Sequence, residues 1–515
     1  MLVLAAALLA VAQGSVLVLP PDAPAGRPEP WIVEMVADQL PRSLAFLGVP
    51  AVERAERLQA HAALEIPVVT LTRATSIRMA EALGASRIVT GEYALDDSGL
   101  AVSLRLLDVE RGVLSAPLTA RGPVETAADL VDSLAWDIAL AVAAPARTRD
   151  DLLAQRSGVS FEAIRMHAQG LGARGPAARI RTVRRALTLA PAFHAARLSL
   201  GRLLLDQREF SAAYETLARI PAEASIARIA RYVQGVALLE VGRYREAATL
   251  YAALVAAHPT SAALNNQALA LLRDGDRGTR AAEVLHQAAA MSPDSLDIAF
   301  NLGWALMVEG APDAAASVLR EVATRAPLER QTRLLLAWAL GLANRIPEQD
   351  EEWKAVAALA PGLETQIRPD LTRRFERIRP SERAFEAEKD TRSRSALAAA
   401  LLGRAQRLHD AGDTRDAMKE AARAAYLDPG NRRVDLLLAR LHRLRGDHES
   451  ALNAFRIFLW AKDDAVVRTE VALLLREMGR VPEARIEAQK ALKLDPANEQ
   501  ARRVLESAPG SPYNR

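Results

Sequence analysis

The sequence contains no cysteine among its 515 residues. This absence excludes disulfides, thiol catalysis, cysteine-ligated zinc, iron–sulfur clusters and a bacterial lipoprotein anchor. Aromatic residues are also scarce, at 4 % of the chain, although hydrophobic residues make up 50 % of it. A composition that is rich in alanine and poor in aromatic residues favours closely packed helices over β-sandwiches or barrels.

The sequence also lacks a strong excess of charge and, beyond its first residues, a long apolar run. Its net charge is +3, which is close to neutral for this length and is not the basic footprint of a nucleic-acid-binding protein. No later stretch approaches the roughly 18 consecutive apolar residues that a membrane span needs. We therefore expect neither a nucleic-acid partner nor a direct membrane span.

Motifs of the common enzyme classes are absent as well. There is no Walker A motif, no H-E-x-x-H and no G-x-S-x-G. Residues Gly170–Gly175 match G-x-G-x-x-G, but the dinucleotide motif has to follow a strand, and this one lies between two predicted helices. His442 and His448 have no partner at the spacing of metal ligands. We expect a non-enzymatic protein with no catalytic residue, metal, cofactor or small-molecule substrate.

Residues 1–12 are predicted to be a signal peptide. Leu2–Ala12 is an apolar run of the length of a signal-peptide core, and Ala10 and Ala12 are the small residues that a cleavage site needs. Export, with a periplasmic location, is the expectation. The first residues carry no Lys or Arg, so a buried N-terminal strand, a start codon assigned too late and a cytoplasmic location remain as alternatives.

Residues 14–148 have the pattern of a small α+β domain. Short apolar runs that end in turn residues predict strands, and helical spacing of apolar residues predicts helices. Pro41 is expected to kink the first helix or to mark its boundary, and Gly84 is expected to cap the second. The predicted strands are Ser15–Pro20, Arg87–Leu95, Leu100–Asp108 and Val113–Ala120, and the predicted helices are Trp31–Phe46, Thr75–Leu83 and Ala127–Ala144.

Three stretches of this domain, Val16–Pro20, Glu81–Tyr93 and Val102–Leu114, resemble the N-terminal domain of TolB-like proteins. The matched residues are strand, turn and cap positions, so the resemblance implies a fold and no chemistry. It also implies a role in the bacterial envelope or in assembly.

The rest of the chain repeats with a period of 34 residues. Prolines recur at Pro259, Pro293, Pro327 and Pro361, and Pro191 lies two periods before the first of these. Alanines and glycines keep the same phase. Thirty-four residues is the period of the tetratricopeptide repeat (TPR), a unit of two helices.

The blocks Asn301–Gly310 and Arg243–Leu254 are similar to the first and second helix of the TPR family. Small residues let the two helices of a repeat approach closely, and a glycine permits the turn between them. Because no single repeat buries its apolar face, neighbouring repeats must stack into a solenoid. The predicted fold class is therefore mainly α, a TPR α-solenoid preceded by the small α+β domain.

Two arrays of repeats are predicted. About six repeats span residues 160–363, and about three span residues 396–508, with a C-terminal capping helix. Between them, residues 364–395 are rich in Arg and Glu and lack the repeat pattern, which predicts a charged linker with few packing contacts. A helical linker, a decayed repeat and a charged docking element all remain open for this stretch.

The TPR resemblance implies that the first helix of each repeat lines a concave groove, and the groove positions of the family select two surfaces here. The apolar surface suits a helix or an extended peptide, with inter-repeat packing as the alternative for its tryptophan pair. The basic surface suits carboxylates, with ordinary solvated charge as the alternative. The predicted protein-binding residues are Tyr232, Asn266, Phe300, Trp304, Met307, Leu334 and Trp338 on the first surface and Arg440, Arg443 and Arg476 on the second.

Together these patterns predict a non-enzymatic TPR scaffold that mediates protein–protein interactions in the bacterial envelope. The first alternative is a cytoplasmic regulatory or sensory module that acts beside a signalling enzyme. The second alternative is an enzyme with its site in residues 14–148, but that stretch has no convergent nucleophile, base or metal-ligand set.

Overall fold

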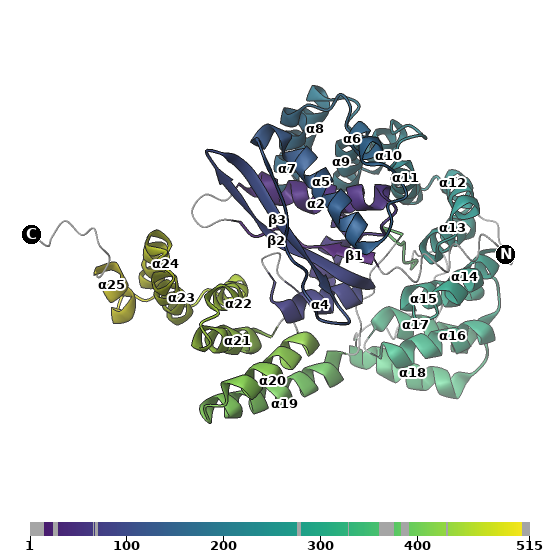
Figure 1. Cartoon of the computed structure of the whole chain (residues 1–515). Helices are drawn as coiled ribbons and strands as arrows, with labels where there is room; N and C mark the ends of the chain where they lie inside the picture. Colours follow the sequence, from purple (N-terminus) through teal and green to yellow (C-terminus); the bar gives the residue numbers. More distant parts are fainter. Residues whose placement is uncertain are drawn as a thin grey trace, which may run out of the picture. The chain divides into compact units, whose positions relative to one another are not determined.

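A computed structural model describes the chain over residues 15–23, 29–64, 66, 71–274, 280–327, 329–359, 375–382, 391–428 and 431–506. The chain divides into two compact units, one made of residues 1–154 together with 391–515 and the other of residues 155–390 (Figure 1). The predicted signal peptide and most of the predicted linker lie outside the described residues.

The first unit begins with a four-stranded sheet made of β1 (Ser15–Val18), β2 (Ala85–Asp96), β3 (Gly99–Asp108) and β4 (Leu118–Gly122). The strands lie in sequence order, with β1 parallel to β2 and the other neighbours antiparallel. The prediction of a small α+β domain before the helical repeats is therefore confirmed. The strand expected at Val113–Ala120 begins at Leu118 instead, because Gly112 turns the chain with a φ of +64° and Pro117 has no N–H for a ladder.

The helices of this domain are α2 (Pro30–Phe46), α3 (Arg54–Ala63), α4 (Arg73–Ala82), the 3₁₀ turn η1 (Val124–Thr126), α5 (Ala127–Val142) and α6 (Arg149–Ala154). Helix α3 was not predicted, and α2 continues through Pro41, which is therefore not a boundary. A buried polar cluster joins α2 to α5, because Gln39 and Ser43 donate to the carboxylate of Asp132 at 2.8 and 2.7 Å.

The second unit is a run of helices in which each helix packs on the next. The helices form successive pairs along the chain, each with a first and a second helix (Figure 1). The pairs are α7 (Phe161–Gly172) with α8 (Pro176–Leu189), α9 (His194–Asp206) with α10 (Phe210–Ala218), α11 (Ala227–Val241) with α12 (Tyr244–Ala257), α13 (Ser261–Arg273) with α14 (Arg280–Met291), α15 (Leu296–Val308) with α16 (Pro312–Arg325), and α17 (Arg330–Leu342) with α18 (Ile346–Leu359).

Glycines set the close spacing within these pairs. A Cβ on Gly235 would lie 2.6 Å from the ring of Tyr251, and a Cβ on Gly303 would lie 2.6 Å from Leu319. A larger residue at either position would push the second helix of the pair away from the first. The periodic small residues of the sequence therefore act as the repeat pattern predicts.

The first unit ends with a second run of helix pairs and a final helix. Glycines at the turns, Gly412, Gly446 and Gly479, adopt φ angles of +83°, +75° and +76°, a region that other residues rarely adopt. The helices are α19 (Thr391–Asp410), α20 (Thr414–Leu427), α21 (Arg432–Leu444), α22 (His448–Ala461), α23 (Ala465–Glu477), α24 (Val481–Leu494) and α25 (Glu499–Glu506). Across the described ranges, no helix is long and apolar enough to cross a membrane.

Candidate peptide-binding site

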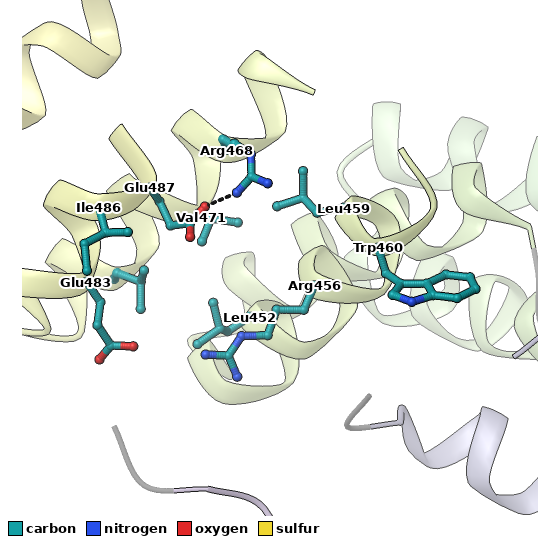
Figure 2. A pocket seen from close by; sticks show the side chains of 10 residues that line it. Leu452, Arg456, Leu459, Trp460, Arg468, Val471, Glu483, Ile486 and Glu487 are labelled. Carbon is teal, nitrogen blue, oxygen red and sulfur yellow. Dashed lines mark hydrogen bonds and ion pairs between the residues drawn. The ribbon is translucent and has the colours of Figure 1, made fainter. Parts of the chain in front are cut away.

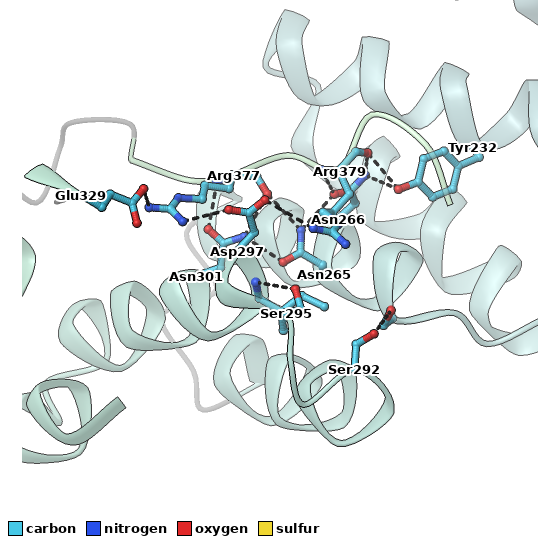
Figure 3. A network of polar contacts seen from close by, with 12 residues as sticks. Tyr232, Asn265, Asn266, Ser292, Ser295, Asp297, Asn301, Glu329, Arg377 and Arg379 are labelled. Carbon is cyan, nitrogen blue, oxygen red and sulfur yellow. Dashed lines mark hydrogen bonds and ion pairs between the residues drawn. The ribbon is translucent and has the colours of Figure 1, made fainter. Parts of the chain in front are cut away.

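Residues 375–382 of the second unit lie across the first helices of four successive pairs. We call the surface lined by α11, α13, α15 and α17 the A-helix face, and residues 375–382 the internal segment. The internal segment has no helix or strand of its own. Its backbone and side chains instead form a network with the A-helix face, which Figure 3 shows from close by.

Two asparagines of the A-helix face bind the backbone of the internal segment. The side-chain carbonyl of Asn301 accepts from the N–H of Arg377, and its amide donates back to the carbonyl of the same residue, both at 2.9 Å. Asn266 makes the same pair of bonds with the N–H and the carbonyl of Arg379, again at 2.9 Å. Because the bound residues are two apart, the internal segment presents alternate backbone groups to the helices, as an extended chain does.

A third asparagine and a tyrosine complete this backbone recognition. The amide of Asn265 donates to the carbonyl of Arg377 (3.2 Å) and to the side-chain oxygen of Asn266 (3.1 Å). The hydroxyl of Tyr232 donates to the carbonyl of Arg379 (2.9 Å). These groups are fully or almost fully buried, so the hydrogen bonds to the internal segment satisfy polar atoms that water does not reach.

Tyr251 holds this network in place from the second helix of its pair. Its hydroxyl accepts from the amide of Asn266 (3.0 Å) and donates to the carbonyl of Tyr232 (3.1 Å). Burial raises the pKa of Tyr251 far above its ordinary range, although the hydrogen bond from Asn266 opposes that shift. The hydroxyl therefore stays protonated and keeps its donor role at any physiological pH.

The arginines of the internal segment meet acidic and aromatic groups. The guanidinium of Arg377 contacts Asp297 at 2.8 Å and Glu329, and it lies 3.6 Å from the ring centroid of Phe300. Arg379 reaches the other oxygen of Asp297 at 3.3 Å. One carboxylate therefore serves both arginines, and the ring adds a cation–π contact to the first of them.

An aromatic side chain and an acid precede these arginines. Phe375 packs edge-on between Trp304 and Trp338, with ring centroids 5.2 and 5.7 Å apart. Glu376 pairs with Arg273 at 2.5 Å and accepts from the indole N–H of Trp304 at 3.4 Å. Its side chain is only 5 % exposed, so this ion pair is largely shielded from solvent.

The other end of the internal segment is held at α11. Ile378 packs against the cluster that includes Tyr232 and Val236, and Glu382 forms an ion pair with Arg228. Contacts therefore extend from α11 at Glu382 to α17 at Phe375.

The A-helix face contains all the predicted residues of the apolar surface. Five of them contact the internal segment directly: Tyr232, Asn266, Phe300, Trp304 and Trp338. Met307 and Leu334 are buried in the core cluster that also includes Phe375. The structure thus brings this set together around a peptide segment, while its role toward another protein stays a prediction.

Sequence reasoning missed several residues that take part. These are Asn265 and Asn301, which bind the backbone, and Arg273, Asp297 and Glu329, which pair with charges of the internal segment. The available signal was the presence of asparagines among the apolar residues of helices α13 and α15.

The expectation that the predicted linker makes few packing contacts is wrong for residues 375–382. Phe375 and Arg379 are buried at 6 % and 5 % exposure. Of the three alternatives left open for this stretch, a charged docking element is the one that describes these eight residues. The rest of residues 364–390 lies outside the described part of the chain.

Two of the three arginines of the predicted basic surface, in the second run of helices, form ion pairs with acids. Arg440 bonds to both carboxylate oxygens of Glu470 (2.6 and 3.1 Å), and Arg443 does the same with Glu477 (2.5 and 3.2 Å). The hydrogen bonds that Arg440 donates to Glu470 raise the pKa of Arg440. Arg476 lies on α23 and has interactions of its own. Arg440 and Arg443 are already paired within the protein, so the surface offers less to an added carboxylate than the sequence indicates.

A pocket of about 330 Å³ lies between α22, α23 and α24 (Figure 2). Arg468 and Glu487 form an ion pair in its wall (2.5 Å), and Trp460 lies at its edge with 60 % of its surface exposed. Its lining combines aliphatic groups with paired charges, and nothing in it indicates a particular ligand. In the part of the chain that the structure describes, no group of His, Asp or Glu is placed to hold a metal ion.

Sequence profiles of the tetratricopeptide repeat match residues 232–277 and 271–339. The chain therefore carries TPR repeats, and the matched residues include most of the helices of the A-helix face. TPR repeats are protein-interaction modules, so the chain is built as an interaction scaffold. Neither match touches residues 14–148, so their TolB-like resemblance stays a prediction. No curated protein matches the sequence.

Several solved structures are similar to parts of the chain at low identity. MamA from Desulfovibrio magneticus RS-1 is 18 % identical over 32 % of this chain and 92 % of its own, with a TM-score of 0.30. YrrB, described as a TPR protein with an unusual peptide-binding site, is 16 % identical over 35 % of this chain and 93 % of its own (TM-score 0.31). A TPR protein from Parabacteroides merdae is 12 % identical over 55 % and 98 % (TM-score 0.33).

Proposed function

We propose that the chain is a non-enzymatic TPR scaffold whose A-helix face binds an extended peptide segment of a partner protein. The observation that carries this proposal is the pair of asparagine contacts, in which Asn266 and Asn301 each bind the N–H and the carbonyl of one peptide residue. A primary amide has one acceptor and two donors, which match the two backbone groups of an extended residue. Such contacts hold a peptide without reading its sequence.

The A-helix face also has the properties of a prepared binding surface. The asparagine side chains are fixed by bonds to one another and to Tyr251. They project from helices, which position side chains more rigidly than loops do. Binding therefore requires little ordering of the face, and the loss of side-chain entropy falls mainly on the peptide.

We further propose that this scaffold works in the bacterial envelope. The support is the apolar run Leu2–Ala12 with small residues at the spacing of a cleavage site. N-terminal sequencing of the protein from its native host tests this location, and the expected mature chain begins near Gln13. An intact Met1 in the cytosolic fraction would favour the alternative, a regulatory module in the cytoplasm.

Selection of displayed random peptides on the immobilised full-length chain tests the binding function. The chain carries Arg377→Gln and Arg379→Gln, which weaken the internal segment and leave the A-helix face unchanged. We expect enriched peptides whose binding is lost when Asn266→Ala and Asn301→Ala are added. Gln267→Ala is the matched control, since it removes an amide from α13 that is not among the described contacts of the internal segment.

Two results would overturn the proposal. The first is that no peptide is enriched although circular dichroism shows the chain to be folded. The second is that the enriched peptides still bind after both asparagines are replaced, which would place the binding site elsewhere.

A further inference from the structure

The internal segment has a side-chain pattern that matches the A-helix face at four positions. Phe375 meets two indoles, Glu376 meets Arg273, and Arg377 meets two carboxylates. Arg379 meets the carboxylate that it shares with Arg377. The backbone contacts of the asparagines accept any sequence, so these side-chain contacts are what would distinguish one peptide from another.

We propose that the A-helix face selects partner segments with an aromatic residue, an acid and an arginine in succession, followed by a second arginine two positions later. We propose, as part of the same inference, that the internal segment is a built-in competitor that such a partner has to displace. This inference rests on the proposed function, because it names the class of peptide and the control of the same site.

Charge complementarity favours this occupant over an apolar helix or an acidic peptide. The side chains of Asp297 and Glu329 are 30 % and 20 % exposed, and both point at the guanidinium of Arg377 (Figure 3). An acidic or apolar residue at this position would remove the guanidinium that Asp297 and Glu329 share, and would leave Asp297 only its longer contact with the second arginine. One position earlier in the peptide the required charge is negative, because the guanidinium of Arg273 pairs with the acid there.

The first arginine position discriminates between arginine and lysine. The guanidinium of Arg377 reaches Asp297 and Glu329 with different nitrogens and also lies over the ring of Phe300. A planar guanidinium with several donors makes these contacts at once, whereas an ammonium is a point charge that cannot reproduce this geometry. A peptide with lysine at this position should therefore bind more weakly than one with arginine.

The internal segment competes at the high local concentration that a tether within one chain provides. A peptide in solution gains access only in the fraction of molecules whose internal segment has left the A-helix face, and its apparent Kd equals the intrinsic Kd divided by that fraction. The wild-type chain should thus bind a matching peptide much more weakly than a chain whose own segment is disabled.

Fluorescence anisotropy with a labelled peptide of sequence FERIRPSE, the internal segment itself, tests the inference. Two full-length chains are compared, the wild type and a variant with Arg377→Gln and Arg379→Gln. We expect the variant to bind at least about 10-fold more tightly, since it has lost charged contacts of the competitor. Peptides with Lys or Glu in place of the first arginine, and a permuted peptide of the same composition, should bind at least about 10-fold more weakly than FERIRPSE.

The outcomes separate this inference from the proposed function. If the variant binds displayed random peptides through Asn266 and Asn301 but prefers none of the FERIRPSE type, the selectivity is wrong while the peptide-binding function stands. If wild type and variant bind FERIRPSE equally, the internal segment is not a competitor. If the variant binds no peptide at all, the proposed function itself fails.

Two further measurements complete the test. Sedimentation velocity of the wild type should give a monomer, and a dimer that dissociates when FERIRPSE is added would identify a second copy of this chain as the occupant and overturn the assignment to a partner protein. If the double variant does not fold, Phe375→Ala replaces it, because it removes the aromatic contact and leaves every charge in place. The same gain in peptide affinity is expected, and an unchanged affinity would contradict the inference.

Discussion

Replacing Asn301 by alanine should release the internal segment without unfolding the helices. Asn301 makes two hydrogen bonds with the backbone of Arg377, both at 2.9 Å. At a net value of about 1 kcal/mol for each bond, the docked state should lose about 2 kcal/mol relative to the released state. This free energy corresponds to an increase of about 30-fold in the released population.

Limited proteolysis with trypsin measures that population. The bond between Arg377 and Ile378 is the reporter, because Arg379 precedes a proline and its bond resists trypsin. In the docked state the side chain of Arg377 is held by Asp297 and Glu329, so cleavage requires release. When re-docking is faster than cleavage, the cleavage rate follows the released fraction. We therefore expect Asn301→Ala to be cut about 30-fold faster at this bond.

Two controls separate release from general destabilisation. Asn301→Asp keeps an acceptor for the N–H of Arg377 but loses the donor, so its rate should lie between those of the wild type and the alanine variant. Gln267→Ala should leave the rate unchanged. The reasoning would be refuted if Asn301→Ala were cut at the wild-type rate, or if cleavage after Arg320, within α16, accelerated equally.

Three further predictions concern stability. Trp338→Ala should lower the free energy of unfolding by roughly 3–5 kcal/mol in urea denaturation, since the side chain is 1 % exposed, and a change below 1 kcal/mol would contradict its core role. Gly303→Ala should destabilise by about 1–3 kcal/mol through its contact with Leu319, whereas Gly403→Ala, which would meet only the end of Arg407, should stabilise by about 0.5–1 kcal/mol in thermal melts. Burial, with a smaller contribution from Asp428, raises the pKa of Asp435 to about 7, so the folded state holds a proton that the unfolded chain releases near pH 4. The free energy of unfolding should therefore fall by on the order of 4 kcal/mol between about pH 4 and pH 7 and level off above pH 7. Asp435→Asn should flatten this pH profile, and an identical profile in the variant would contradict the assignment.

The helical repeats were predictable because their signal is local and recurs. Gly303 sits at a close helix contact, and Gly242 and Gly310 adopt φ angles of +87° and +82° at the turns, as small periodic residues suggest. The requirement for a small residue at each of these positions comes from its own repeat, either from the paired helix or from the turn. A pattern of period 34 therefore contains most of the information that the helix pairs need.

The binding network was predictable only in part. Groove positions taken from the family recur every 34 residues. The position equivalent to Asn266 in the next repeat is therefore Phe300, and Asn301, one residue later, is not predicted. A peptide that crosses the helices at an angle contacts a different height on each successive helix. Its contact residues are therefore not spaced by 34. The internal segment itself is a long-range partner, more than 70 residues from Asn301, and no local pattern marks it.

The tryptophans show why packing and binding could not be separated from the sequence. From the sequence, Trp304 and Trp338 fit either inter-repeat packing or contact with a partner peptide. The ring of Phe375 lies against both, so they are buried side chains and peptide contacts at once. A loss of stability on truncation therefore does not exclude a role in binding, and the asparagine variants are the cleaner test.

The same contacts determine how one peptide could replace another. In a solenoid each repeat normally contacts only its neighbours, but the internal segment connects α11, through Arg228 and Tyr232, with α17, through Trp338. On an empty A-helix face, water would replace the internal segment as the partner of these amides and carboxylates, at a net cost of about 1 kcal/mol for each hydrogen bond exchanged. The empty state is therefore scarcely populated, and a partner that offers the same backbone and charge contacts gains that cost back as it binds. Exchange of one segment for another is thus the favourable route, and it requires a partner that resembles the internal segment.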